Sequence, residues 1–303
     1  LAMVLSERAA ANPAIVQAYR QRWGLDAPPL QRYLIYVSHL LRGDLGESIA
    51  TQQPVRADLA RFFPATVELA LSATFLAIFI GIPLGILAAV YHERWVDHVA
   101  RFISLLGVSV PVFWLGLLAL SFLYYRLQIL PGPGRLSPRL EAPPVLTGLL
   151  LLDSLLSGRY DAFADALRHL ILPALVLGAY SMGLITRIMR SSMLEVLRQD
   201  YIRAARAKGL SFWRVIMRHA FRNAALPVLT AAGLAFGNLM AGAVMTETVF
   251  AWPGIGRYAV ESAAKVDFAP LMGVTLAVAL IYIVINLVVD ILYAVFDPRI
   301  RLG

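Results

Sequence analysis

Five long apolar segments constrain this chain more than any other feature of its sequence. A helix that crosses a bilayer core needs about 20 mostly apolar residues. The five segments hold only three Asp, Glu, Lys or Arg side chains between them: Glu68, Glu247 and Asp290. They are Thr66–Val90, Phe102–Tyr125, His169–Thr186, Leu226–Phe250 and Leu271–Phe296. The sequence therefore predicts an all-α polytopic membrane protein with five spans.

Composition supports a membrane protein and argues against a soluble one. Hydrophobic residues make up 59% of the 303 residues and charged residues only 15%, against about 25% charged in ordinary soluble domains. The formal net charge of +8 would suggest nucleic acid as the partner of a soluble protein. In a membrane protein it reflects Arg and Lys held on the cytoplasmic side. We therefore expect membrane lipid, and no nucleic acid, around this chain.

The sequence offers no recognisable catalytic or metal-binding motif. There is no cysteine, and the five histidines show no paired spacing of the kind that binds zinc. The phosphate-binding loop of nucleotide hydrolases, the dinucleotide fingerprint and the serine-hydrolase elbow are also missing. We therefore expect no enzyme activity, no metal and no cofactor in this chain.

Positive charge predicts which parts of the chain face the cytoplasm. Nine Arg and Lys lie between the third and fourth apolar segments, in residues 187–225, and the positive-inside rule places them in the cytoplasm. Alternation then places residues 1–64, 126–168 and 251–270 outside. We divide the chain into an extracytoplasmic N-terminal loop region, 1–64, and a membrane domain, 65–303. An external start without a signal peptide needs a preceding span, so we expect six spans in the native protein.

Residues 188–225 carry the most specific pattern. A basic helix from Ile188 to about Lys208 is predicted to end at Gly209, because glycine readily adopts the left-handed conformation of a helix end. Ser211 is predicted to cap a second helix, Phe212–Ala225. Small residues near the turn, Ala204, Ala205 and Ala207, would allow another protein to approach closely. From the residues alone, a loop that binds anionic lipid explains the pattern equally well.

Two stretches of this loop resemble the EAA loop of permease subunits of ATP-driven importers. They are Asp200-Tyr-Ile-Arg-Ala-Ala-Arg-Ala-Lys-Gly-Leu210 and Arg222-Asn-Ala-Ala-Leu-Pro227. Arg203 stands where the general pattern has Glu. Further stretches are similar to the dipeptide, oligopeptide and nickel branch: Gly43–Gly46, Arg190–Leu197, Thr246–Arg257, Asn286–Tyr293 and Asp297–Arg301. The inserted stretch Leu146–Pro173 is most similar to the B-type subunit of dipeptide permeases.

The resemblance implies a type I ABC importer transmembrane domain in a bacterial cytoplasmic (inner) membrane. It implies a second homologous permease as heterodimer partner, two cytoplasmic ATPase subunits and an extracytoplasmic substrate-binding protein. The ATPase-coupling residues would be Arg203, Ala204, Ala205, Lys208, Gly209 and Leu210. The implied substrate is a dipeptide or short oligopeptide, with nickel and glutathione as alternatives within the family. An ion-coupled carrier or an intramembrane enzyme would need deep paired charges or facing acids, which the sequence does not present.

Some residues within the apolar segments are candidates for the translocation pathway: Ser109, Pro111, Asn238, Met240 and Glu247. The ionisable residues lie near the ends of their segments, so a structural role is the favoured interpretation for Glu247, and Glu68 is expected to meet interface water or a buried arginine. Gly107 and Pro111 are expected either to kink their span or only to loosen it. Gly81 and Gly85 are expected to allow close helix packing.

Overall fold

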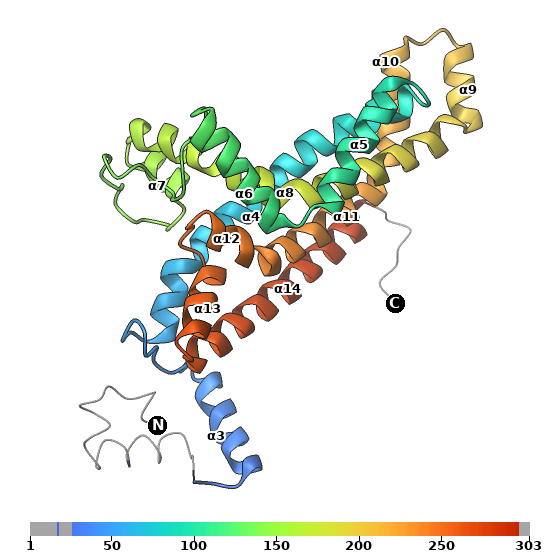
Figure 1. Cartoon of the computed structure of the whole chain (residues 1–303). Helices are drawn as coiled ribbons and strands as arrows, with labels where there is room; N and C mark the ends of the chain where they lie inside the picture. Colours follow the sequence, from blue (N-terminus) through green and yellow to red (C-terminus); the bar gives the residue numbers. More distant parts are fainter. Residues whose placement is uncertain (1–16, 18–25, 297–303) are drawn as a thin grey trace.

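The computed structural model describes residue 17 and residues 26–296, and this part of the chain is helical, without strands (Figure 1). The tail Asp297–Arg301 lies outside the described residues. The helices are α3 (Pro29–Leu41), α4 (Val55–Val90), α5 (Trp95–Ser109), α6 (Val112–Ala119), α7 (Leu150–Leu156), α8 (Tyr160–Leu197), α9 (Asp200–Ala207), α10 (Phe212–Arg214), α11 (Phe221–Gly242), α12 (Val244–Val249), α13 (Ile255–Ala264) and α14 (Phe268–Phe296), with π-helical turns η1 (Leu120–Arg126) and η2 (Val215–Ala220).

Four helical stretches are long and apolar enough to cross a membrane, and a bent helix pair supplies a fifth. The four are Val55–Val90, Tyr160–Leu197, Phe212–Met240 and Phe268–Val288. All five predicted apolar segments are therefore helical. Helix α4 starts at Val55, so the predicted boundary between residues 64 and 65 falls inside a helix. At about 1.5 Å per residue, α4 and α8 are longer than the bilayer core, and their ends extend beyond it.

The second apolar segment is broken in two. Helices α5 and α6 meet at an angle of 110° around Val110 and Pro111. Val110 is extended, with φ −86° and ψ 127°, because the ring of a following proline disfavours the helical conformation. Pro111 also has no N–H to continue the helical ladder. The kink expected at this proline is confirmed and is a complete break.

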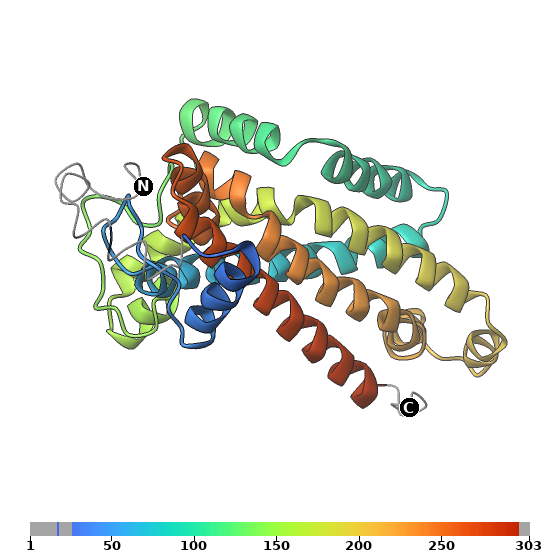
Figure 2. The same cartoon turned by 90° about the horizontal axis from the view of Figure 1, so that it is seen from below.

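The centre of the molecule is the packing of α4 against α8, which run side by side in both views (Figures 1 and 2). Glycines allow the two helices to touch. A Cβ atom placed on Gly85 would lie 2.6 Å from Cβ of Met189, and one on Gly178 would lie 2.7 Å from the carbonyl oxygen of Ala73. Real side chains do not approach so closely, so glycine is required at these crossings. The packing role expected for Gly81 and Gly85 is confirmed, since both are buried or tightly contacted.

The elongated molecule has two different ends. At one end α9 and α10 project beyond the spans, and at the other α3, α7, α13 and the connecting loops gather (Figure 2). We call the first the coupling end and the second the loop end. The positive-inside prediction assigns the coupling end to the cytoplasm and the loop end to the exterior.

Candidate coupling and translocation sites

The 188–225 loop at the coupling end is a compact helical unit with a sharp turn at Gly209. The φ angle of Gly209 is +74°, and a Cβ atom there would meet nothing within 4 Å. Glycine is therefore favoured by backbone conformation and not by lack of space. The expected left-handed helix end is confirmed. Ser211 does stand at the start of α10, but its side chain makes no capping hydrogen bond.

The helices of this loop differ from the sequence prediction in their boundaries. Helix α8 ends at Leu197 and α9 begins at Asp200, after an extended Gln199 with ψ 150°, so no single helix runs from Ile188 to Lys208. The second predicted helix, Phe212–Ala225, continues through the π-helical turn η2 into α11 without stopping. The break before α9 turns one face of that short helix back towards the spans.

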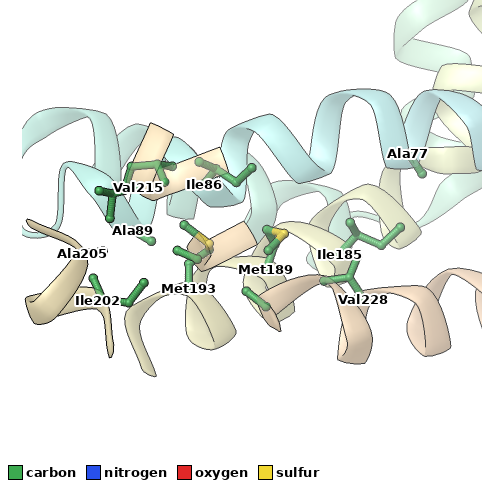
Figure 3. Packing of buried hydrophobic residues seen from close by; sticks show 13 residues of the cluster. Ala77, Ile86, Ala89, Ile185, Met189, Met193, Ile202, Ala205, Val215 and Val228 are labelled. Atoms are coloured by element: carbon green, nitrogen blue, oxygen red, sulfur yellow. The ribbon is translucent and has the colours of Figure 1, made fainter. Parts of the chain in front are cut away.

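That face completes an apolar core (Figure 3). Ile202 and Ala205 of α9 pack with Met189 and Met193 of α8, and the cluster also includes residues of α4, η2 and α11. Ala205 is only 7% exposed. Its methyl group therefore fills the loop's own core and is not offered at the surface, and a role of Ala205 in ATPase coupling stays a prediction.

Other residues of the proposed coupling set do lie at the surface. Arg203, Ala204, Lys208 and Gly209 are exposed, and Leu210 is half-buried. The guanidinium of Arg203 lies 2.8 Å from the carboxylate of Asp200 in an ion pair that is open to solvent. Such exposed pairs contribute little stability, so the charge of Arg203 stays available for another contact.

Exposed aromatic side chains surround this turn, and the sequence pattern did not single them out. Phe212 and Trp213 form an edge-to-face pair with ring centroids 5.6 Å apart, and each is 51% exposed. The hydroxyl of Tyr201 accepts a hydrogen bond from Asn223 at 2.8 Å. Exposed aromatic residues on a helical projection are typical of protein or membrane contact sites.

A buried ion pair lies beside the base of the loop. The guanidinium of Arg190 donates two hydrogen bonds to the two carboxylate oxygens of Asp97, at 2.7 and 2.8 Å. Asp97 is fully buried and also accepts a hydrogen bond from the backbone N–H of Glu93 at 3.0 Å. The pair joins the start of α5 to α8. No spacing in the sequence connects these two residues, which is why the pattern analysis missed them.

At the loop end, Glu247 is held in a closed polar network. Its carboxylate accepts hydrogen bonds from the Thr66 hydroxyl at 2.6 Å and from the backbone N–H of Arg257 at 2.9 Å. Gly254 and Gly256 wrap around it so closely that a Cβ on either would collide with the carboxylate. Glu247 is completely buried. These contacts support the structural interpretation of Glu247, and a role in the pathway stays a prediction.

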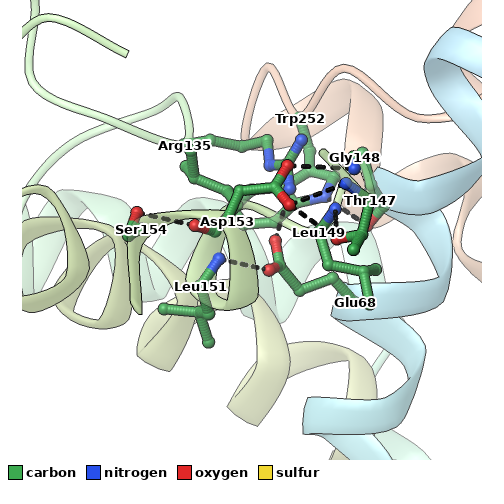
Figure 4. A network of polar contacts seen from close by, with 11 residues as sticks. Glu68, Arg135, Thr147, Gly148, Leu149, Leu151, Asp153, Ser154 and Trp252 are labelled. Carbon is green, nitrogen blue, oxygen red and sulfur yellow. Dashed lines mark hydrogen bonds and ion pairs between the residues drawn. The ribbon is translucent and has the colours of Figure 1, made fainter. Parts of the chain in front are cut away.

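A second network at the loop end is built on Glu68 (Figure 4). One oxygen of Glu68 pairs with the guanidinium of Arg135, and the other accepts the backbone N–H of Leu151 at 2.8 Å. Arg135 also lies over the ring of Trp252, 5.4 Å from its centroid. The buried arginine expected for Glu68 is therefore present, and it ties the 127–149 segment to α4.

Asp153 organises the same segment through backbone contacts. Its carboxylate accepts hydrogen bonds from the N–H of Thr147 at 2.8 Å, the Thr147 hydroxyl at 2.7 Å and the N–H of Gly148 at 2.9 Å. Burial alone would raise the pKa of Asp153, but these donors stabilise the charged form and leave the pKa below its ordinary value. The carboxylate is therefore charged at neutral pH and holds the loop.

The remaining pathway candidates divide by burial. Met240 is buried in a cluster with Ala65 and Leu69, which favours a packing role, and its place in the pathway stays a prediction. Asn238, Ser109 and Pro111 are exposed in the single chain, the last two at the break between α5 and α6. Polar side chains within a membrane-spanning helix usually face protein or water and not lipid. The exposed face of α11 that bears Asn238 therefore needs protein or water against it.

Comparison with known proteins places this architecture in a family. The family model described as "Binding-protein-dependent transport system inner membrane component" matches residues 81–302. The chain belongs to this family of transport permeases. The match includes the whole 188–225 loop and both helices of the broken span. A multi-pass membrane location follows from the family and from the apolar helices.

Curated relatives of the permease cover most of its length. A probable D,D-dipeptide transport system permease of Escherichia coli K12 is 51% identical over 97% of this chain and 86% of its own length. A di/tripeptide transport system permease of Pseudomonas aeruginosa UCBPP-PA14 is 47% identical, with coverages of 92% and 83%. A glutathione transport system permease of Salmonella choleraesuis SC-B67 is 37% identical, with coverages of 96% and 86%.

Solved structures show the same fold at low sequence identity. A chain of the MetNI methionine ABC transporter, in an inward-facing conformation, superimposes with a TM-score of 0.59 at 16% identity, covering 79% of this permease and 96% of that chain. A chain of an amino acid ABC transporter gives 0.52 at 15% identity, with coverages of 81% and 95%. The predicted all-α, type I ABC importer architecture is therefore confirmed.

Proposed function

We propose that this permease carries short peptides, dipeptides above all, across the bacterial cytoplasmic membrane into the cell. The observation that carries the proposal is the similarity to peptide permeases. Relatives named for dipeptide, D,D-dipeptide or di/tripeptide transport are 43–51% identical over most of the chain. The relative named for glutathione transport is 37% identical. Glutathione is itself a short peptide, so it is the second candidate substrate, ahead of nickel.

We propose partners from two observations: the family to which the chain belongs, and the surfaces that the single chain leaves exposed. A second, homologous permease would cover the exposed face of α11 that bears Asn238, and the two chains would form the pathway between them. Two cytoplasmic ATPase subunits would supply the energy, because this chain has no nucleotide-binding motif. An extracytoplasmic binding protein would deliver the peptide at the loop end. We propose no cofactor within this chain.

We propose that the 188–225 loop transmits the movement of an ATPase subunit to the spans. Its exposed surface combines Arg203, Ala204, Lys208 and the aromatic pair Phe212–Trp213. Basic and aromatic side chains of this kind suit an apolar groove with an acidic rim. Its interior, by contrast, is one apolar core shared with α4, α8 and α11. A loop built in this way would move together with the ends of those helices.

Uptake assays test the substrate. A bacterial strain that lacks its own peptide importers should regain growth on a dipeptide as sole source of an essential amino acid when it receives the complete transporter. Competition with tripeptides, longer peptides, glutathione and nickel then ranks the substrates. Dipeptides should compete best. Competition by nickel or glutathione alone, with none from dipeptides, would show that the substrate proposal is wrong.

A further inference from the structure

Helices α5 and α8 meet along one face of each. Asp97 and Ser104 are seven residues apart on α5, and Arg190 and Gly183 are seven apart on α8, so each pair shares a helix face. Beyond the ion pair described above, the hydroxyl of Ser104 donates a hydrogen bond to the carbonyl oxygen of Gly183 at 2.7 Å. Gly107 lies against Ala179, where a Cβ would approach the carbonyl oxygen to 2.5 Å. Three contacts in series therefore fasten α5 to α8.

Of these three contacts, only the ion pair includes a residue of the 188–225 loop, Arg190. Arg190 stands between Met189 and Met193, two fully buried residues of the apolar core that also contains Ile202 and Ala205 of α9. A displacement of that core therefore displaces the turn of α8 that carries the guanidinium. The two parallel hydrogen bonds fix both the distance and the orientation of Asp97 relative to that turn.

Helix α6, beyond the break, belongs to the other end of the molecule. It packs against Val249, the last residue of α12, against the following Phe250, and against Val176 of α8. The two halves of the broken span are thus attached to different surroundings. The first half, α5, which begins at Trp95 and carries Asp97, is attached to the coupling end, and the second half, α6, which begins at Val112, is attached to the loop end.

We propose that Asp97 and Arg190 are positioning residues for transport, which make α5 follow the 188–225 loop when an ATPase moves it. The break at Val110–Pro111 then lets α5 change its angle while α6 stays with the loop end. The proposal rests on the proposed function and names the internal link through which that coupling passes. A buried carboxylate needs its partners, so a variant that lacks one of the two hydrogen-bonding groups loosens this link.

The experiment uses the complete transporter, with partner permease, ATPases and binding protein, in lipid vesicles. The quantity measured is the number of dipeptides imported per ATP hydrolysed. Asp97→Asn and Arg190→Gln should lower this ratio about tenfold, within the range of coupling between distant sites, while the ATPases remain bound. Arg190→Lys keeps the charge but not the two parallel hydrogen bonds, so it should assemble normally and still show a lower ratio.

Arg101→Gln is the matched control. Arg101 approaches the same carboxylate at 3.5 Å, but its side chain is 49% exposed, so its loss should leave the ratio unchanged. An unchanged ratio in all the Asp97 and Arg190 variants would overturn the proposal. So would a parallel loss of folded transporter and of uptake at constant ratio, since that is a structural role only. Failure of the unaltered transporter to import any dipeptide would instead contradict the proposed function.

Discussion

The two ends of this permease are held together by different forces. At the coupling end, an apolar core of methionine, isoleucine, valine and alanine side chains joins five helical elements. At the loop end, hydrogen bonds to buried carboxylates join the segments. Backbone N–H groups of other segments or loops donate to Glu68, Asp153, Glu247 and Asp267.

The difference follows from the backbone. The coupling end is mostly helical, so most of its N–H groups are satisfied within the helices and its joining contacts are mainly apolar, with the Asp97–Arg190 pair beside them. The loop end contains irregular segments, 42–54, 127–149 and 250–254, whose N–H groups need acceptors. A carboxylate can accept several at once. We infer that the coupling end moves as one helical unit with a free outer surface, whereas the loop end is locked by specific polar contacts.

The largest effect is expected from removing a carboxylate at the loop end. Glu247→Ala leaves the Thr66 hydroxyl and the N–H of Arg257 without their acceptor in a fully buried place. Each unsatisfied buried donor costs about 1–3 kcal/mol, so the free energy of unfolding should fall by about 3 kcal/mol. Thermal unfolding of the purified permease in detergent measures this loss. Glu261→Ala, at an exposed position, is the control and should leave Tm unchanged.

A smaller effect is expected from overfilling the core at the coupling end. Ala205→Trp forces a large ring into a packed site and should cost about 2 kcal/mol. Ala204→Trp, one residue away and exposed, should leave Tm unchanged and instead weaken retention of the ATPases. Thermal unfolding and co-purification of the ATPases, measured on both variants, separate the two sites. Equal behaviour of the two variants would contradict the burial of Ala205.

Substitution of Gly209 should disturb the turn of the 188–225 loop, because the backbone there has a positive φ angle. Gly209→Val places a β-branched residue at positive φ, which costs about 1–3 kcal/mol. We expect intact membrane insertion with reduced ATPase retention and uptake. Gly242→Val is the control, because that glycine has ordinary φ and no atom within 4 Å of a built Cβ. Normal transport by the Gly209 variant would argue against a role for this turn in coupling.

The smallest expected effect is a loss of thermal stability at low pH that comes from Asp153 at the loop end. The pKa of Asp153 is lower in the folded protein than in the unfolded chain. Its contribution to stability is therefore complete above the unfolded pKa, near 3.9, and is lost as the pH falls through the folded value. Asp153→Asn should show a smaller drop in Tm between pH 5 and pH 3 than the unaltered permease. An equal drop in both would mean that other carboxylates dominate.

The sequence predicted the spans and the turn better than the side-chain contacts. Apolar length and the proline at position 111 are local properties, so the five helical segments and the break could be recognised without a structure. Whether a small residue such as Ala205 faces outward or inward depends on the break at Arg198–Gln199, which no strong breaker residue marks. The partners of Asp97 and Glu247 lie 93 and 181 residues away, and no pattern in one sequence connects positions so far apart.

The central claim is that the outer surface of the 188–225 loop contacts an ATPase inside the cell. The chain has no cysteine, so single cysteines can be introduced at Ala204 and, at the opposite end, at exposed Gln53. A short thiol-to-amine cross-linker should join the cysteine at 204 to an ATPase subunit in the assembled transporter. The cysteine at 53 should give no such product and should react with an impermeant thiol reagent added outside intact cells. Labelling of the cysteine at 204 from outside, with no cross-link to the ATPase, would contradict the claim.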